Sequence, residues 1–270
     1  MGIFSVFKKT NVLYFPGCIT YFKFPEKFEL YTNIFDKLGI DFRLLDNQVC
    51  CGLEALEAGY EAEARKIMRK NLEIFRENGV QEIITNDPAC LKAFSQDYSD
   101  MPDWNIQIIN IWDLIFAKLE SKPKLIKQKT FEKVVYHDPC YLGRYMGVYD
   151  SPRNILRLLG YELKEFIDNR ENSFCCGSCG GLSRTNPELA DKIAKERILQ
   201  AKRLGIKKII VASLDNYKIL KKNTTEGIEI KEMSEVLAEA IGIKQREISK
   251  EDEAERINEE VIDIREENIA

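Results

Sequence analysis

The stretch Asn11–Cys18, NVLYFPGC, decides the fold, because a closely similar stretch, KVVYHDPC, occupies Lys133–Cys140. Each is a short run of β-branched and aromatic residues, typical of a buried strand, that ends in a proline and a cysteine. The two cysteines stand 122 positions apart. A strand that recurs together with its following cysteine indicates that one structural unit is used twice.

Four further blocks recur in the same order, between 121 and 126 positions apart. They are LGIDFRLLD and LGYELKEFI, the two CCG triplets, NGVQEIIT and LGIKKIIV, and IQIINIWDLI and IEIKEMSEVL. The repeat predicts two domains, 1–120 and 131–242, joined by a linker at 121–130. The charged segment 243–270 is predicted to form either a helix or a partly disordered tail.

Within each unit, short β-rich runs alternate with long stretches of helical periodicity. The predicted strands of the first unit are Val12–Phe15, Asp41–Leu45, Glu82–Thr85 and Ile106–Ile109, and the clearest helices are Ala58–Asn78 and Pro187–Leu204. This order indicates an α/β fold with two pseudo-symmetric, Rossmann-like domains, each built on a parallel sheet covered on both faces. Such sheets place their chemistry beyond the carboxyl ends of the strands, which is where the cysteines fall.

The composition excludes several classes of function. Of the 270 residues 44% are hydrophobic, and 40 Lys and Arg against 44 Asp and Glu give a net charge of -4. No basic block suited to nucleic acid is present. The apolar runs fall far short of the roughly 20 residues that cross a bilayer, and no signal-peptide core is visible. We therefore expect a cytoplasmic protein that reaches a membrane only through a partner.

The eight cysteines carry the chemistry, and four of them form the pairs Cys50–Cys51 and Cys175–Cys176, each followed by glycine. Eight disulfide-forming cysteines would be unusual in a cytoplasmic chain, whereas thiolates are ligands for iron and zinc. Two adjacent thiolates face one centre only in a special turn, for which Gly52 and Gly177 provide positive φ and close backbone approach. The predicted metal ligands are Cys18, Cys50, Cys51, Cys90, Cys140, Cys175, Cys176 and Cys179.

These motifs resemble the cysteine-rich CCG domain proteins, a family typified by the B-type component of heterodisulfide reductase. The family also includes the D-type component of that enzyme and iron-sulfur subunits of glycolate, lactate, glycerol-3-phosphate and some succinate oxidising systems. The resemblance covers Asn11 to about Ile241 and rests on the lone cysteine, the CCG triplet 32 to 35 residues later, and YHDPCYLGRY at Tyr136–Tyr145.

The resemblance implies a set of cofactors and partners. In the fullest family members each repeat ends in CxxC, and five thiolates hold a noncubane 4Fe-4S cluster at which a disulfide is cleaved in two one-electron steps. The chain itself has neither a ferredoxin run of cysteines nor a GxGxxG motif. The implied partners are therefore a ferredoxin-like iron-sulfur subunit or a flavoprotein subunit that delivers electrons, and a thiol or disulfide substrate.

The chain departs from the family pattern at the end of each repeat. Where CxxC is expected, the first repeat has DPAC, with Asp87 and Cys90, and the second has SLDN, with Ser213 and Asn216. The second repeat instead has the additional Cys179. Three arrangements remain open: one cluster in each repeat, one cluster shared between the repeats, or a cluster in one repeat and zinc in the other.

Three other side chains have two interpretations each. His137, the only histidine, is either a catalytic proton donor to a leaving thiolate or a residue that orders its loop through hydrogen bonds. Arg144 is a catalytic candidate that binds an anionic substrate, or it caps the loop. Asp87 is either a carboxylate ligand or the N-cap of a helix.

These observations support the hypothesis of a heterodisulfide reductase-like iron-sulfur subunit that transfers electrons and reduces a disulfide or heterodisulfide, with the chemistry in the second repeat. One alternative is a non-catalytic subunit of a flavoprotein dehydrogenase that conducts electrons or serves assembly or membrane attachment. The other is a subunit in which zinc only stabilises the fold.

Overall fold

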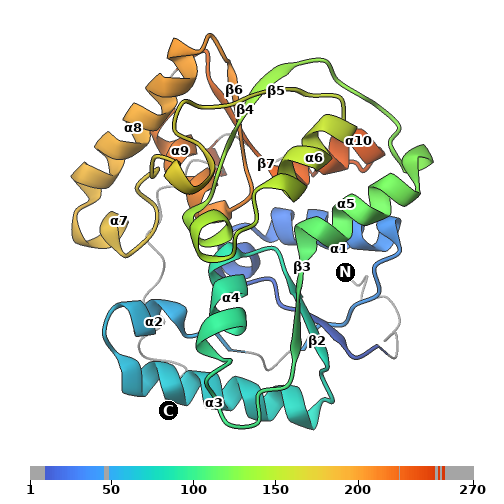
Figure 1. Ribbon diagram of the computed structural model, residues 1–270, viewed down its shortest axis with the longest axis vertical. Helices are drawn as coiled ribbons and strands as arrows, with labels where there is room; N and C mark the ends of the chain where they lie inside the picture. Colours follow the sequence, from blue (N-terminus) through green and yellow to red (C-terminus); the bar gives the residue numbers. More distant parts are fainter. Residues whose placement is uncertain (1–9, 46–48, 225, 247–248, 250, 253–270) are drawn as a thin grey trace.

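Two parallel sheets, one from each repeat, organise the computed structural model shown in Figure 1. The structure describes residues 10–45, 49–224, 226–246, 249 and 251–252. The first sheet has the order β1 (Val12–Tyr14), β2 (Glu82–Thr85), β3 (Gln107–Asn110); the second has the order β5 (Glu162–Lys164), β4 (Lys133–His137), β6 (Lys208–Val211), β7 (Glu229–Glu232). Every pairing is parallel, which confirms the predicted duplicated α/β fold.

The prediction of a full strand over 41–45 is wrong, because the structure has a shorter strand contact there. Only a bridge between Leu13 and Arg43 forms, in which the amide of Tyr14 donates to Arg43 O and the amide of Arg43 donates to Val12 O. All five residues of this segment remain at least partly exposed, so little apolar burial holds a longer edge strand. The bridge nevertheless occupies the place beside β1 that β5 occupies beside β4, and both repeats therefore share one strand order.

Helices cover both faces of each sheet (Figure 1). The first repeat has α1 (Pro25–Leu38), α2 (Leu53–Glu57), α3 (Glu61–Glu77), α4 (Pro88–Lys92) and α5 (Ile111–Ser121), and the second has α6 (Asp150–Leu158), α7 (Leu182–Thr185), α8 (Pro187–Arg203), α9 (Leu214–Asn223) and α10 (Met233–Ile241). Two π-helical turns, η1 (Ile19–Lys23) and η4 (Tyr141–Tyr145), directly follow Cys18 and Cys140. The two predicted helices are α3 and α8, and their ends differ from the prediction by at most three residues.

Alternate side chains of each strand enter different cores, as the period of two requires. Leu13 packs on the α3 side of the first sheet, while the next residue, Tyr14, enters a core between the two sheets. Val135 likewise packs on the α8 side, while Val134 enters the core between the sheets. This shared core combines α1 and α5 with α6 and α10, so the two repeats pack as one body.

The loop after the first strand of each repeat reaches into the other repeat. Phe24, just after η1, packs edge-on against Tyr217 in the core of the second repeat. Tyr141, at the start of η4, packs against the core of the first repeat and donates its hydroxyl to Glu57 Oε2 at 2.5 Å. Through these contacts, the cysteine-bearing edges of the two sheets face each other.

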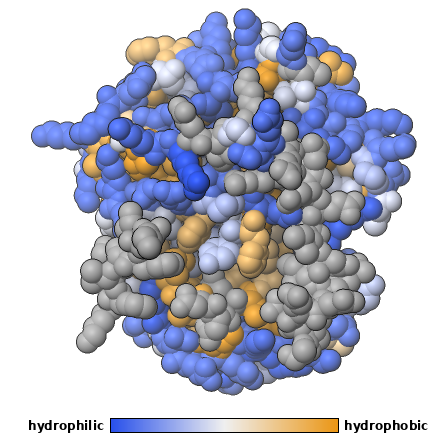
Figure 2. All heavy atoms as spheres, turned by 180° about the vertical axis from the view of Figure 1, so that it is seen from behind, coloured by the Kyte–Doolittle hydropathy of each residue, from blue (hydrophilic) through white to orange (hydrophobic). Residues whose placement is uncertain are grey.

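The surface is hydrophilic over most of the face shown in Figure 2, with apolar side chains gathered near its middle. Among the residues that the structure describes, no helix combines the length and apolarity of a membrane span.

The predicted linker contains the end of α5 and a short 3₁₀ turn, Pro123–Leu125. The predicted tail or helix at 243–270 falls mostly outside the described residues.

Ile155→Ala should destabilise both repeats together, because Ile155 is fully buried in the shared core. Truncation of a buried isoleucine costs about 2–5 kcal/mol of unfolding free energy. Fluorescence of Trp104 and Trp112, both in the first repeat, and far-ultraviolet circular dichroism should report one denaturant transition that shifts equally in both signals.

The control is Ile167→Ala, because the Ile167 side chain is 91% exposed. It should change the unfolding free energy by less than about 0.5 kcal/mol. A shift of the circular dichroism transition without the fluorescence transition would contradict the shared core.

Candidate metal centres

The four cysteines of the first repeat form one contiguous set at the carboxyl edge of the first sheet. Cys18 follows β1, the Cys50–Cys51 pair precedes α2, and Cys90 lies in α4. The thiols of this set interact in series: Cys50 interacts with Cys18 and Cys51, and Cys51 interacts with Cys90. Cys51 and Cys90 are buried, and the other two are half-buried.

The cysteines of the second repeat also gather, but in a different pattern. The thiol of Cys140 interacts with those of Cys175 and Cys179. Cys176 is fully buried, and the Asn216 amide donates to its sulfur at 3.1 Å. Ser178 Oγ lies 3.4 Å from the sulfurs of both Cys176 and Cys179.

Asn216 stands where the first repeat has a thiol. It lies 126 positions after Cys90, which is the repeat distance. Cys90 contacts the second cysteine of its CCG triplet, Cys51, and Asn216 contacts the second cysteine of the other triplet, Cys176. The second repeat therefore exchanges one thiol for an amide donor and gains Cys179 from the glycine-rich loop.

The glycine of each CCG triplet makes the turn that the sequence predicts. Gly52 and Gly177 have φ of 85° and 89°, which confirms the expected positive φ. The Gly52 amide lies 3.5 Å from Cys50 Sγ, and the Gly177 amide lies 3.3 Å from Cys175 Sγ; both donate to the sulfur. The turn thus directs a backbone donor at the first thiol of each pair.

Two buried polar side chains at one repeat position hold the CCG loops, and neither was predicted from the sequence. Asn71 on α3 donates to Cys50 O at 2.9 Å and accepts from the Val49 amide at 3.2 Å. Arg197, 126 positions later on α8, donates to Ser173 Oγ at 3.2 Å. The signal that could have found them is a polar residue at the same place on the apolar face of each repeat's long helix.

His137 lies inside β4 and is fully buried. Its Nδ1 accepts a hydrogen bond from Arg197 Nε at 3.1 Å. Burial, together with the charges of Arg197 and Arg144, lowers the pKa of His137 well below its usual value, which favours the neutral ring. These contacts support the interpretation in which His137 orders its surroundings.

Arg144 contacts a candidate ligand directly. Its Nη2 donates to Cys140 Sγ at 3.0 Å, and its Nη1 donates to Ser173 O at 2.9 Å. The residue is exposed, so its guanidinium links the Cys140 thiol to the solvent side of the site. Both interpretations of Arg144 remain open, since the same group braces the loop and presents a positive charge.

A second buried arginine holds the loop that carries Cys140. Arg153 on α6 bonds to both carboxylate oxygens of Asp138, at 2.6 and 2.8 Å, and its Nε lies 2.8 Å from Glu165 Oε1. Asp138 also accepts from the Arg170 amide at 2.8 Å. The charge of Arg153 is thus matched by carboxylates within the loop network.

Asp87 is the N-cap of α4, as one of its two interpretations predicted. Its Oδ1 accepts from the amides of Ala89 and Cys90 at 2.8 and 3.4 Å. Burial raises the pKa of this carboxyl to about 6. A Cβ on Gly17 would lie 2.4 Å from Asp87 Oδ2, so the loop before Cys18 packs tightly on this cap.

The thiols differ strongly in acidity. Hydrogen bonds from Cys18 and then Cys51 lower the pKa of the Cys50 thiol to about 3. Burial raises the pKa of Cys176 to about 12. The surroundings of Cys50 and Cys176 therefore shift the pKa values of these two thiols in opposite directions.

The donor chemistry fits an iron-sulfur centre in each repeat. Each site offers four soft sulfur donors, together with amide N–H groups that bond to sulfur, as cluster sites do. In the described part of the chain, no three His, Cys, Asp or Glu side chains are arranged to hold a single metal ion. The described thiol contacts join cysteines of the same repeat, an arrangement that favours two sites over one shared site.

The sequence of this chain is similar to a known family and to several known proteins. The family model described as a cysteine-rich domain, CCG, matches residues 12–95 and 134–215. The D-type component of dihydromethanophenazine:CoB–CoM heterodisulfide reductase from Methanosarcina acetivorans is 27% identical over 250 residues, covering 87% of this chain and 60% of its own length. EtfAB:quinone oxidoreductase from Syntrophomonas wolfei is 34% identical over 197 residues, covering 71% of this chain and 27% of its own length.

An uncharacterized iron-sulfur protein of Methanocaldococcus jannaschii is 31% identical over 191 residues, covering 70% of this chain and 37% of its own length. The chain thus spans 60% or less of the length of these curated relatives. An aspartate racemase homologue from Pyrococcus horikoshii aligns with 86% of this chain and all of its own, at 14% identity and a TM-score of 0.36, which is only a weak likeness.

Gly177→Ala should destabilise the protein more than Gly59→Ala, although both glycines have nearly the same φ, 89° and 87°. A left-handed alanine costs roughly 1–2 kcal/mol at either position. At Gly177 the new Cβ would also lie 2.6 Å from Ala190 O, whereas nothing lies within 4 Å at Gly59. Denaturant unfolding of the two variants measures the difference, and equal losses would show that close packing of the turn is unimportant.

Proposed function

The chain belongs to the cysteine-rich CCG domain family, and we propose that it is an iron-sulfur redox subunit with one centre in each repeat. The observation that carries the proposal is the pair of thiol sets at equivalent carboxyl edges of a duplicated fold. The proposed ligands are Cys18, Cys50, Cys51 and Cys90 in the first repeat and Cys140, Cys175, Cys176 and Cys179 in the second. Zinc in one repeat is the alternative that metal analysis decides.

A 4Fe-4S cluster, when bound, supplies electrons one at a time. The chain's own contribution is to orient the ligand sulfurs and set the charge around them. The amides of Gly52, Gly177 and Asn216 donate to sulfur, and hydrogen bonds of this kind tune the reduction potential of a centre.

We place substrate reduction at the second repeat. There Asn216 replaces a thiol, Cys176 is fully buried and accepts from Asn216, and Arg144 extends from Cys140 to the solvent. A disulfide that reacts there accepts two electrons and two protons, its S–S bond breaks, and two thiols leave. The electrons come from a reduced ferredoxin-like or flavoprotein partner, as the multisubunit relatives suggest.

In this scheme the two predicted catalytic residues act differently. Arg144 faces the substrate and holds an anionic thiol compound beside Cys140. His137 is a positioning residue, because it is fully buried and bonds to Arg197.

An electron-conducting role is the second candidate. The 34% identity to EtfAB:quinone oxidoreductase and the lack of CxxC at the end of each repeat favour it. In that case both centres pass electrons onward and no disulfide is reduced. Turnover of disulfides with a reduced viologen dye under anaerobic conditions separates the two roles.

Serine in place of Cys50, Cys51, Cys175 or Cys176 should lower the iron and acid-labile sulfide of anaerobically purified protein, because a hydroxyl is a poor substitute for a soft thiolate. Cys90→Ser should reduce the content of the first centre alone. Ser183→Ala, on the exposed turn of α7, is the control and should keep full content. Unchanged iron and sulfide in all four cysteine variants would refute the ligand assignment.

Arg144→Gln should lower kcat/KM for disulfide reduction about tenfold while leaving iron and sulfide intact, because one charged hydrogen bond is worth roughly 1.5–3 kcal/mol. Arg144→Lys should recover part of the loss, since the positive charge remains. Arg203→Gln, which removes an exposed arginine paired with Glu196, serves as the matched control. Wild-type turnover in Arg144→Gln would exclude a substrate contact at this residue.

A further inference from the structure

We infer that buried Arg197 supplies the positive counter-charge of the second centre and makes that centre the more readily reduced of the two. Electrons would then pass from the first repeat to the second. The inference rests on the proposed function, since it requires a redox centre in each repeat.

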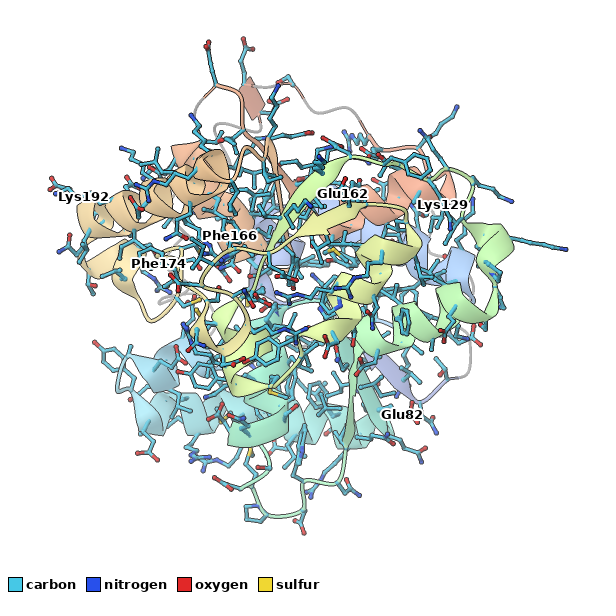
Figure 3. All side chains as sticks on the ribbon, turned by 45° about the horizontal axis from the view of Figure 1, so that its top comes forward. Glu82, Lys129, Glu162, Phe166, Phe174 and Lys192 are labelled. Atoms are coloured by element: carbon cyan, nitrogen blue, oxygen red, sulfur yellow. The ribbon has the colours of Figure 1, made fainter. Side chains whose placement is uncertain are left out.

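Arg197 is fully buried, and its hydrogen-bond partners among the described residues are neutral. Nε donates to His137, Nη1 to Asp168 O and Gln200 Oε1, and Nη2 to Ser173 Oγ. The guanidinium also lies 3.5 Å over the ring of Phe166, which is labelled in Figure 3. Within the described ranges no carboxylate forms a salt bridge with it. A buried charge without a counter-ion is strongly unfavourable, so this arginine requires an anion nearby.

Arg153 shows that the same domain can pair a buried arginine with acids. It is also fully buried, but Asp138 and Glu165 neutralise it. The favourable charges on Arg197 are, from the largest down, those of Asp138, the Cys176 thiol, Asp168 and Cys140. Asp138 is already bonded to Arg153, and Asp168 is exposed to solvent. The sulfurs of the second centre are therefore the counter-charge that remains inside the protein.

Arg197 keeps its charge at neutral pH despite its burial. Removal from water lowers its pKa, but only to about 10. Arg144, which bonds to Cys140, adds a second positive group on the solvent side. Both cations stabilise negative charge on the second centre, and a reduced cluster carries one negative charge more than its oxidised form.

The first repeat has the opposite electrostatic surroundings. At the position equivalent to Arg197 it has the neutral Asn71, which holds the CCG loop without adding charge. The buried carboxylate of Asp87 acts on Cys18 and Cys90. Added negative charge is therefore disfavoured at the first centre and favoured at the second.

The direct test is a redox titration of the anaerobic wild-type protein, followed by electron paramagnetic resonance. Cys90→Ser and Cys175→Ser assign the signals to the first and second centres. The second centre should be reduced at the higher potential. Reduction of the first centre at the higher potential would overturn the inference but leave the iron-sulfur function standing, whereas absence of iron and sulfide would refute the proposed function itself.

Two substitutions of Arg197 distinguish the effect of its charge from the effect of its hydrogen bonds to the loop. Arg197→Gln should lower the equilibrium constant for reduction of the second centre at least tenfold, which is about 59 mV for one electron, and leave the first centre unchanged. Arg197→Lys should stay close to wild type. Equal shifts in the two variants would show that Arg197 acts only by holding the loop.

Metal-free protein gives a readout that does not need an intact second centre. If Arg197 supports thiolate charge, Cys140 should react more slowly with iodoacetamide in Arg197→Gln than in wild type or Arg197→Lys. Mass spectrometry of the labelled peptides measures the rates, and Cys18 and Cys50 serve as internal controls. Equal rates for Cys140 in all three proteins would overturn the inference.

Discussion

The core between the two sheets is the constraint on which the cysteine sites depend. It buries α1 and α5 of one repeat against α6 and α10 of the other, together with Tyr14 and Val134 from the two first strands. Because this packing fixes the relative position of the sheets, their carboxyl edges meet, and the loops after Cys18 and Cys140 cross to the opposite repeat. Two separate α/β domains on a flexible linker would leave the thiol sets without a defined separation.

The duplicated scaffold permits different chemistry at equivalent positions. Asn71 and Arg197 occupy one position and hold the two CCG loops, but only Arg197 brings a charge. Cys90 and Asn216 occupy another, where a thiol is exchanged for an amide. A potential difference between two centres therefore needs only a few substitutions, because the turns and strands that hold the ligands stay the same.

The sequence predicted the parts of the fold that depend on local pattern. The repeat distance, the two-residue period of the strands and the glycine after each cysteine pair were sufficient for the two sheets, the long helices and the positive φ of Gly52 and Gly177. The extent of the strand near Arg43 was not predictable, because it depends on how much of an edge segment is buried. Arg197 and Arg153 were missed because their partners are distant in sequence, and only the folded chain shows that one is paired with acids and the other is not.

The contrast between the two arginines also bears on stability. Arg153 contributes to the metal-free fold, since its carboxylate partners are part of the chain. Arg197 gains its full counter-charge only when the cysteines are anionic, as they are when they ligate metal. In the proposed scheme, formation of the second centre would also relieve the buried charge of Arg197, so assembly of the centre and folding would be coupled through this residue.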